Sequence, residues 1–251
     1  MASLQDITDY LDRELKIAEI PDYPGAINGL QLENNGEVLK VAAAVDASLP
    51  VFEKAVAEGV GLLIVHHGMF WQGASPVTGA IYRKLRLAME SNMALYSAHI
   101  PLDVHPEWGN NAILAGKIGM QDARCFFDWK GIKLGMCQEM DMSLDELKAR
   151  VELAVGGAAH LCPGGGARAG KVGVITGGAG SEVAAIARSG IQTFVTGEGP
   201  HWSYSLAEEL GINVIYAGHY ATETFGVCSV VEHLNERFGV ETCFVDHPTG
   251  M

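Results

Sequence analysis

Apolar and polar residues alternate along most of this chain in blocks of strand and helix length. Short apolar runs are followed by segments in which apolar residues recur every three or four positions. The predicted strands are residues 41–45, 61–65, 93–98, 132–139, 171–176, 193–196, 213–216 and 241–245. The predicted helices are one beginning near residue 4 and then residues 50–58, 81–90, 108–118, 144–153, 182–189, 202–210 and 224–237. Such alternation favours an α/β protein with mostly parallel sheets.

The pattern also repeats within the chain. Residues 40–71 align without a gap with residues 171–202, and both segments predict a strand, a helix and a second strand. Residues 93–103 align in the same way with residues 213–223, and both contain a strand, a histidine and a carboxylate four residues later. Because an internal repeat usually marks a repeated structural unit, we predict two similar α/β domains, residues 1–124 and 125–251.

Two adjacent histidines, His66 and His67, end one of the apolar predicted strands. Ligands of open α/β sheets bind where strands end and loops begin. Neighbouring strand residues point to opposite faces, so one histidine for each of two metal ions suits this pair better than one shared ion. Most adjacent histidines bind no metal, and the metal hypothesis therefore depends on further ligands elsewhere in the chain.

The repeat supplies these ligands, because each half contains a histidine followed four residues later by a carboxylate. The candidate metal ligands are His66, His67, Asp103, His219 and Glu223. His99 is either a further ligand or a group that orients one. Imidazole and carboxylate groups without a thiolate suit Zn, Fe or Mn. We therefore expect the two domains to meet around a dinuclear metal site.

Glycine-rich segments offer weaker candidates. Residues 176–180 (TGGAG) follow a predicted strand but lack a complete nucleotide-binding pattern, so a tight turn is favoured. Residues 163–170 are predicted to form a loop. Glu198 and His201 lie at the strand end equivalent to that of the paired histidines, where they are either part of the site or the start of a helix. His99 and His201 are also candidate catalytic residues that shuttle protons.

The charge of the chain narrows the range of partners. A formal net charge of −13 argues against general nucleic-acid binding, which depends on Lys and Arg. Five cysteines without C-x-x-C spacing are typical of reduced thiols in a cytosolic protein. We find no signal-peptide pattern at the start and no apolar run near the ~18 residues of a membrane span. A soluble, cytoplasmic protein without membrane contact is expected.

Three ordered motifs carry a resemblance to a known family: V-H-H-G at 65–68, S-A-H-I-P-L-D at 97–103 and A-G-H-Y-A-T-E at 217–223. Over nearly the whole chain, the sequence resembles the GTP cyclohydrolase 1 type 2 homologues, also named for a yeast Ngg-interacting factor three. This resemblance implies interlinked α/β domains, a two-metal centre held by the five candidate ligands, and a ring-shaped homohexamer. Gly68 departs from relatives that often have proline there, a difference that concerns the substrate more than metal binding.

These observations lead to the hypothesis of a metal-dependent hydrolase that acts on a small, nucleotide-like substrate. Two metal ions lower the pKa of bound water toward neutrality, and Glu223 would bridge them. Only the resemblance suggests a GTP cyclohydrolase-type reaction, in which the guanine ring opens and formate is released. Two alternatives stay open, namely a two-metal phosphoesterase and a non-catalytic metal-binding scaffold or regulatory protein. An open coordination position would indicate a catalyst.

Overall fold

The computed structural model describes residues 2–71, 73 and 75–251 and contains two compact units. Unit 1 consists of the chain up to Leu102 together with Gly226–His247, and unit 2 of Asp103–Phe225 and Pro248–Met251. The division thus differs from the boundary predicted at 124/125. The reason is that α5 (Asn110–Lys117) packs into the core of unit 2, while the last strand returns to the sheet of unit 1.

Unit 1 is built on a sheet whose strand order is β13-β4-β5-β6-β2. Its strands are β2 (Gly29–Leu32), β4 (Lys40–Asp46), β5 (Leu62–His67), β6 (Ala94–Ser97) and β13 (Glu241–Phe244). All neighbours pair in parallel except β2, which lies antiparallel to β6. A small antiparallel pair joins β1 (Ala2–Ser3) and β3 (Glu37–Val38). The mostly parallel sheet predicted for this part of the chain is confirmed.

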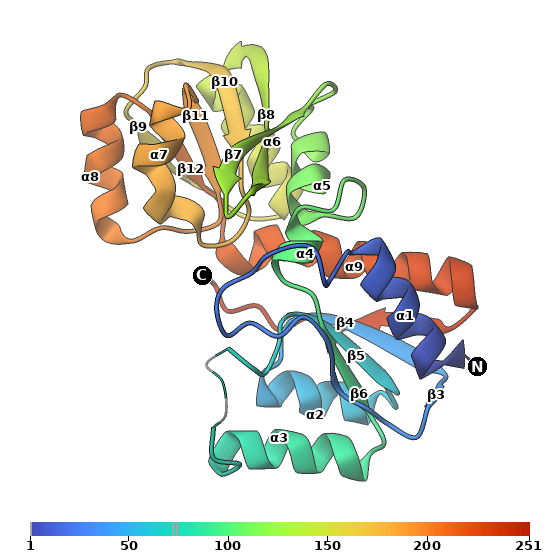
Figure 1. The fold of residues 1–251 in the computed structure, drawn as a ribbon. Coiled ribbons are helices and arrows are strands. Elements are labelled where there is room, and N and C mark those ends of the chain that lie inside the picture. Colours follow the sequence, from blue (N-terminus) through green and yellow to red (C-terminus); the bar gives the residue numbers. More distant parts are fainter. Residues whose placement is uncertain (1, 72, 74) are drawn as a thin grey trace. The chain divides into compact units, whose positions relative to one another are not determined.

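Helices cover both faces of this sheet (Figure 1). They are α1 (Leu4–Glu14), α2 (Leu49–Ala57), α3 (Gly79–Glu90) and the part of α9 (His219–Phe238) that follows Gly226. The α1 helix begins where the side chain of Ser3 accepts a hydrogen bond from the backbone N–H of Asp6. Phe52 of α2 is fully buried in the core cluster that also contains Leu63 and Leu95 of the sheet.

Unit 2 is built on a six-stranded sheet with the strand order β7-β8-β10-β11-β12-β9. Its strands are β7 (Arg124–Trp129), β8 (Ile132–Ser143), β9 (His160–Pro163), β10 (Arg168–Val174), β11 (Thr193–Thr196) and β12 (Asn213–Tyr216). The three central strands β10, β11 and β12 are parallel, and the others pair antiparallel. The helices are α5, α6 (Leu144–Val155), α7 (Val183–Arg188) and α8 (His201–Leu210), with a 3₁₀ turn at Ala179–Glu182.

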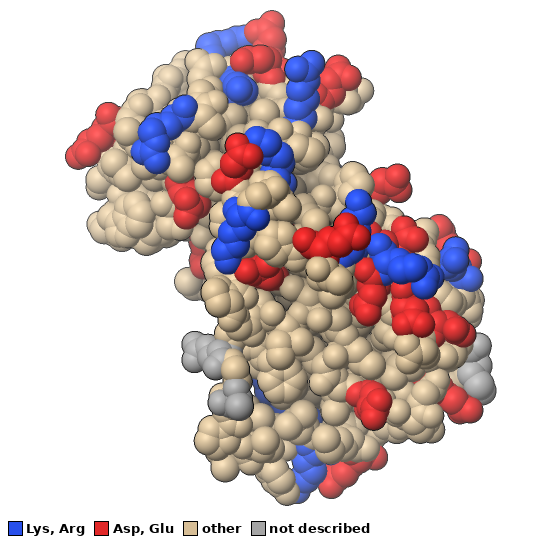
Figure 2. Space-filling view, viewed as in Figure 1, with Lys and Arg blue, Asp and Glu red and all other residues tan. Residues whose placement is uncertain are grey.

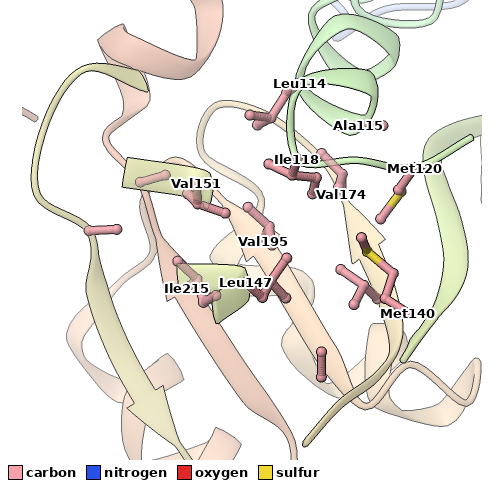
Figure 3. Packing of buried hydrophobic residues seen from close by; sticks show 14 of the residues in the cluster. Leu114, Ala115, Ile118, Met120, Met140, Leu147, Val151, Val174, Val195 and Ile215 are labelled. Carbon is pink, nitrogen blue, oxygen red and sulfur yellow. The ribbon is translucent and has the colours of Figure 1, made fainter. Parts of the chain in front are cut away.

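The core of unit 2 lies between α5, α6 and the central strands. Figure 3 shows Leu114 of α5 and Ile118, the residue that follows this helix, on the side of the sheet that carries Val174, Val195 and Ile215. These residues are almost completely buried. Since each fully buried aliphatic side chain contributes about 1.5–3 kcal/mol, this cluster holds the strand ends of unit 2 in fixed positions.

The internal repeat predicts the architecture correctly. In unit 1, β4, β5 and β6 are successive parallel neighbours with α2 between the first two, and an antiparallel strand follows β6 in the sheet. In unit 2, β10, β11 and β12 are arranged in the same order, with α7 between the first two and antiparallel β9 beside β12. Equivalent strands therefore end at equivalent places in the two units.

Several segments differ from the sequence-based expectations. The edge strands β7 and β9 were not predicted, and β9 and β10 take up both ends of the predicted loop 163–170. The short helix α4 (Ile100–Asp103) follows β6. The last helix begins at His219 rather than near residue 224, because the backbone becomes helical immediately after Gly218, whose φ is +93°.

Charged residues of both signs are mixed on one face of the protein. On the face shown in Figure 2, Lys and Arg stand among Asp and Glu rather than forming one basic patch. Within the described ranges, no helix combines the length and the hydropathy that a membrane span requires.

Candidate metal centre

Three histidines gather at the ends of β5 and β6 in unit 1. His66 and His67 are the last residues of β5, and His99 follows β6. One ring nitrogen from each lies within 4.8 Å of the other two, so the three imidazoles could hold a metal ion. His66 is fully buried. The sequence predicts the first two as ligands and leaves the role of His99 open.

The paired histidines do not face away from each other. Strand alternation predicts opposite faces for His66 and His67, yet their ring centroids are 4.9 Å apart. The β5 strand ends at His67, so both side chains can turn over the same edge of the sheet. The premise of one metal ion per histidine therefore does not follow from strand geometry.

Each imidazole of this group is held through its Nδ1 atom. The Nδ1–H of His66 donates to the carbonyl oxygen of Ala98 at 2.9 Å, and that of His67 donates to Asp46 Oδ1 at 2.8 Å. The Nδ1–H of His99 donates to Asp22 Oδ1, also at 2.8 Å. A hydrogen bond at Nδ1 fixes the tautomer in which Nε2 can ligate, and metal-binding histidines almost always have such a partner.

The carboxylate of Asp22 is held in place beside His99 by several hydrogen bonds. Its carboxylate accepts hydrogen bonds from His99, the Asn28 amide and the backbone N–H of Tyr23. Burial alone would raise the pKa of Asp22, but these hydrogen bonds and the charge of His99 lower it below its ordinary value. The side chain thus stays a carboxylate that orients His99. Neither Asp22 nor Asp46 is part of a sequence motif that marks it as a partner of these histidines, and both lie at least 20 residues before the histidine that they contact.

A second set of groups that could bind a metal ion lies in unit 2 at the start of α9. His219 and Glu223 are four residues apart, so they share one face of the helix, and His219 Nε2 is 3.1 Å from Glu223 Oε2. On the other side of the ring, the Nδ1–H of His219 donates to Glu198 Oε1 at 2.9 Å. The sequence left two roles open for Glu198, in the site or in the start of a helix. This contact favours a role in the site, where Glu198 orients His219.

Proton binding at His219 follows from these carboxylates. Burial alone would lower the pKa of this histidine, but the hydrogen bonds and charges of Glu223 and Glu198 outweigh burial and raise the pKa to about 9. In the metal-free protein, the resulting stabilisation of the fold is fully present below pH 6.5 and is lost as the pH rises through about 9. A metal ion that binds Nε2 must displace this proton.

We therefore expect the affinity for Mn²⁺ to rise with pH between 7.5 and about 9 and to level off above that value. One displaced proton corresponds to about a tenfold gain in affinity per pH unit. Competition with a chelator of known affinity at several pH values measures this slope. Equal affinities at pH 7.5 and 9 would contradict the raised pKa of His219.

Asp103 is the remaining predicted ligand, and it is buried in unit 2 at the end of α4. Its Oδ1 accepts a hydrogen bond from the Asn110 amide at 2.8 Å and lies 3.3 Å from the Thr176 hydroxyl, whose one hydrogen is shared with Asn111 Oδ1 at 3.1 Å. Thr176 also donates its backbone N–H to Asn111. These contacts fix the carboxylate of Asp103 in one orientation, as expected of a group with a ligating or structural role.

The glycine-rich segment after β10 lies against the second set. Gly177 has a φ of +68°, and a Cβ atom at this position would collide with Glu223 Oε1. A Cβ atom at Gly178 would lie 3.4 Å from His219 Cε1. The segment bends at Gly177 and Gly178 before the 3₁₀ turn Ala179–Glu182, and the lack of side chains at these glycines lets the backbone pass beside His219 and Glu223.

The structure thus groups the predicted residues within each unit. His66 and His67 lie together with His99 in unit 1, and His219 and Glu223 lie together in unit 2. Asp103, expected in the first domain, belongs to unit 2. His201 begins α8 and is exposed, and its catalytic role stays a prediction.

Comparison with known proteins gives full-length matches. A family model described as Duf34/NIF3 (NGG1p interacting factor 3) matches residues 2–250. A protein of Archaeoglobus fulgidus named GTP cyclohydrolase 1 type 2 homolog is 38% identical over 99% of this chain and 100% of its own length. A protein of the same name from Pyrococcus abyssi is 40% identical, over 98% of this chain and 99% of its own.

Solved structures agree with these matches. TTHA1606 from Thermus thermophilus has a TM-score of 0.87 and 39% identity, with 99% of this chain and 100% of that chain covered. HcgD from Methanocaldococcus jannaschii, in its reduced form, has a TM-score of 0.87 and 28% identity, with 98% of each chain covered. The fold of the chain is therefore shared with proteins of known structure along nearly its whole length.

Proposed function

We propose that this chain, which belongs to the Duf34/NIF3 family, is a metal-dependent hydrolase. One observation carries the proposal: His66, His67 and His219 each donate Nδ1–H to a fixed acceptor. Such acceptors are the usual partners of metal-binding histidines. The proposed ligands of two divalent metal ions are His66, His67, Asp103, His219 and Glu223.

The donor set fits a hard or borderline divalent ion. Imidazole and carboxylate groups without thiolate suit Zn, Fe or Mn. When bound, such ions supply Lewis-acid chemistry and lower the pKa of water. The side chains of Asp46 and Glu198 keep the imidazoles of His67 and His219 oriented. His99, whose Nδ1–H is held by Asp22, is the proposed group that moves a proton at its Nε2 atom.

The proposed substrate is a small nucleotide-like molecule. Support comes from the name GTP cyclohydrolase 1 type 2 homolog, which relatives at 38% and 40% identity carry. We further propose that the reaction opens a purine-type ring by hydrolysis. We also propose that the protein is cytoplasmic and forms a homohexamer. Sedimentation of the purified protein measures the number of chains in the assembly.

Metal content is the first test. Elemental analysis of the protein, purified without added metal and then supplied with Zn, Fe or Mn, should find about two equivalents per chain. The Glu223→Gln variant keeps the size of the side chain but removes its charge, and it should bind clearly less metal. Glu236→Gln is the matched control, because Glu236 is an exposed residue of the same helix. Absence of metal from the supplied protein would refute the proposal.

Activity is the second test, and it uses the metal-loaded protein. Formate release from GTP should be detectable and should fall with the metal content of Glu223→Gln. Hydrolysis of p-nitrophenyl phosphate without formate release would instead identify a phosphoesterase. Bound metal without turnover of either compound would overturn the hydrolase proposal in favour of a metal-binding scaffold.

A further inference from the structure

Unit 2 contains a pocket of about 480 Å³ beside the second ligand set. It opens between the segment after β11, the first turn of α8 and the strands β9 and β12. Its lining includes His160, Glu198, His201, Ser203, Tyr204 and Tyr216. This volume is within the range of small-molecule sites.

Glu198 connects the pocket to His219. One carboxylate oxygen, Oε1, accepts the Nδ1–H of His219, and the same side chain lines the pocket. A molecule in the pocket therefore touches the group that orients a proposed metal ligand. Gly199 makes the wall tight, because a Cβ atom there would lie 2.7 Å from Ser203 Oγ and 2.9 Å from the ring of Tyr216.

Two polar side chains of the pocket, those of Glu198 and Tyr216, can accept hydrogen bonds from a ligand. The hydroxyl of Ser203 donates to the carbonyl oxygen of Pro200 at 2.6 Å. A serine has one hydroxyl hydrogen, so the Tyr216 hydroxyl must be the donor in their 2.7 Å contact. The oxygen of Tyr216 then offers only lone pairs to a ligand. The second carboxylate oxygen of Glu198 can likewise accept a hydrogen bond, as a carboxylate offers only acceptors.

Aromatic rings form the walls beside these acceptors. The His160 ring lies 5.6 Å from that of Tyr204 and 6.3 Å from that of Tyr216, measured between centroids. Burial raises the pKa of Tyr216 above its ordinary value, so its phenol stays neutral. Flat aromatic walls bind planar rings by stacking, and a negatively charged acceptor edge disfavours a phosphate group.

We propose that this pocket binds the planar nitrogen heterocycle of the substrate, and that Glu198 and Tyr216 accept hydrogen bonds from adjacent N–H groups on its edge. The proposal rests on the proposed function, because it places the ring beside the metal ligands. It also specifies that the phosphates of a nucleotide lie outside the pocket. Aminopurines and aminopyrimidines with neighbouring N–H donors are the matching class of ligand.

Titration calorimetry with the metal-loaded protein tests this assignment. Guanosine presents adjacent N–H donors, whereas inosine lacks the amino group, so inosine should bind about tenfold more weakly or worse. His160→Ala should weaken guanosine binding by about tenfold through lost stacking. Tyr216→Phe keeps the ring but removes the acceptor, and it should narrow the difference between the two nucleosides. His247→Ala, outside the pocket, should bind guanosine like the parent protein.

The outcomes separate this inference from the proposed function. Elemental analysis should find the same metal content in His160→Ala as in the parent protein. Normal metal content without guanosine binding, or a preference for inorganic phosphate or guanidinium over guanosine, would overturn the pocket assignment alone. Guanosine binding that His160→Ala leaves unchanged would do the same. Guanosine binding in a protein that takes up no metal would support the pocket and refute the hydrolase.

Discussion

The Phe194→Ala variant is expected to lose about 3–5 kcal/mol of the unfolding free energy of unit 2. Phe194 lies in the interior strand β11, and its side chain is fully buried. Its neighbours across the sheet are Gly173 of β10, which has no side chain, and Val214 of β12, whose short side chain cannot fill the space left by the ring. The variant therefore keeps a cavity, and the loss should lie in the upper part of the range for aromatic truncations.

Urea unfolding combined with amide hydrogen exchange measures this loss, because exchange reports on unit 2 separately. The Phe194→Leu variant is the matched control and should lose only about 1–1.5 kcal/mol, since leucine fills most of the space. Peptides from the core of unit 1, such as those around Phe52, should remain as protected from amide hydrogen exchange as in the parent protein. A loss below about 1 kcal/mol in Phe194→Ala would show that the site collapses around the missing ring.

The second large effect is expected from Asp46→Asn, which should lower the affinity for divalent metal by about 10–100-fold. Asp46 is paired with His67 across β4 and β5, and its Oδ1 accepts the Nδ1–H of that histidine at 2.8 Å. The asparagine keeps the size of the side chain but loses the charge that fixes the tautomer of His67. The side chain is one-third exposed, so the fold should tolerate the change.

Competition with a fluorescent chelator gives the affinities of both proteins. Asp9→Asn is the control, because Asp9 is an exposed carboxylate whose contact is with Gln5. Its metal affinity should equal that of the parent protein. If Asp46→Asn also retained the parent affinity, His67 would have to be oriented by other contacts or would not be a ligand.

The repeat explains why so much of the fold was predictable. Unbroken apolar runs mark β4 and β5 at residues 41–45 and 62–65, and a gapless alignment relates this part of the chain to residues 171–202, which contain most of β10 and all of β11. Edge strands were harder to predict because they are short and partly exposed. In β7, for instance, several residues face solvent, so the apolar signal that marks a buried strand is absent.

The site was predictable only where the ligands share a local motif. His66 and His67 are adjacent, and His219 and Glu223 are one helical turn apart, so their spacing shows in the sequence. Asp22 contacts a histidine 77 residues away, and only the fold brings such residues together. The division into two units differs from the predicted domain boundary for a related reason, because α5 packs into a core formed by residues much later in the chain.

The return of Gly226–His247 to unit 1 has a consequence for the order of events during synthesis. Almost all of unit 2 is one continuous stretch of chain, so its sheet can assemble as soon as that stretch leaves the ribosome. The sheet of unit 1 has to wait for β13, which pairs with β4. Until β13 is synthesised, β4 presents an open edge to its surroundings, and unit 1 therefore completes its sheet after unit 2, although most of unit 1 precedes unit 2 in the chain.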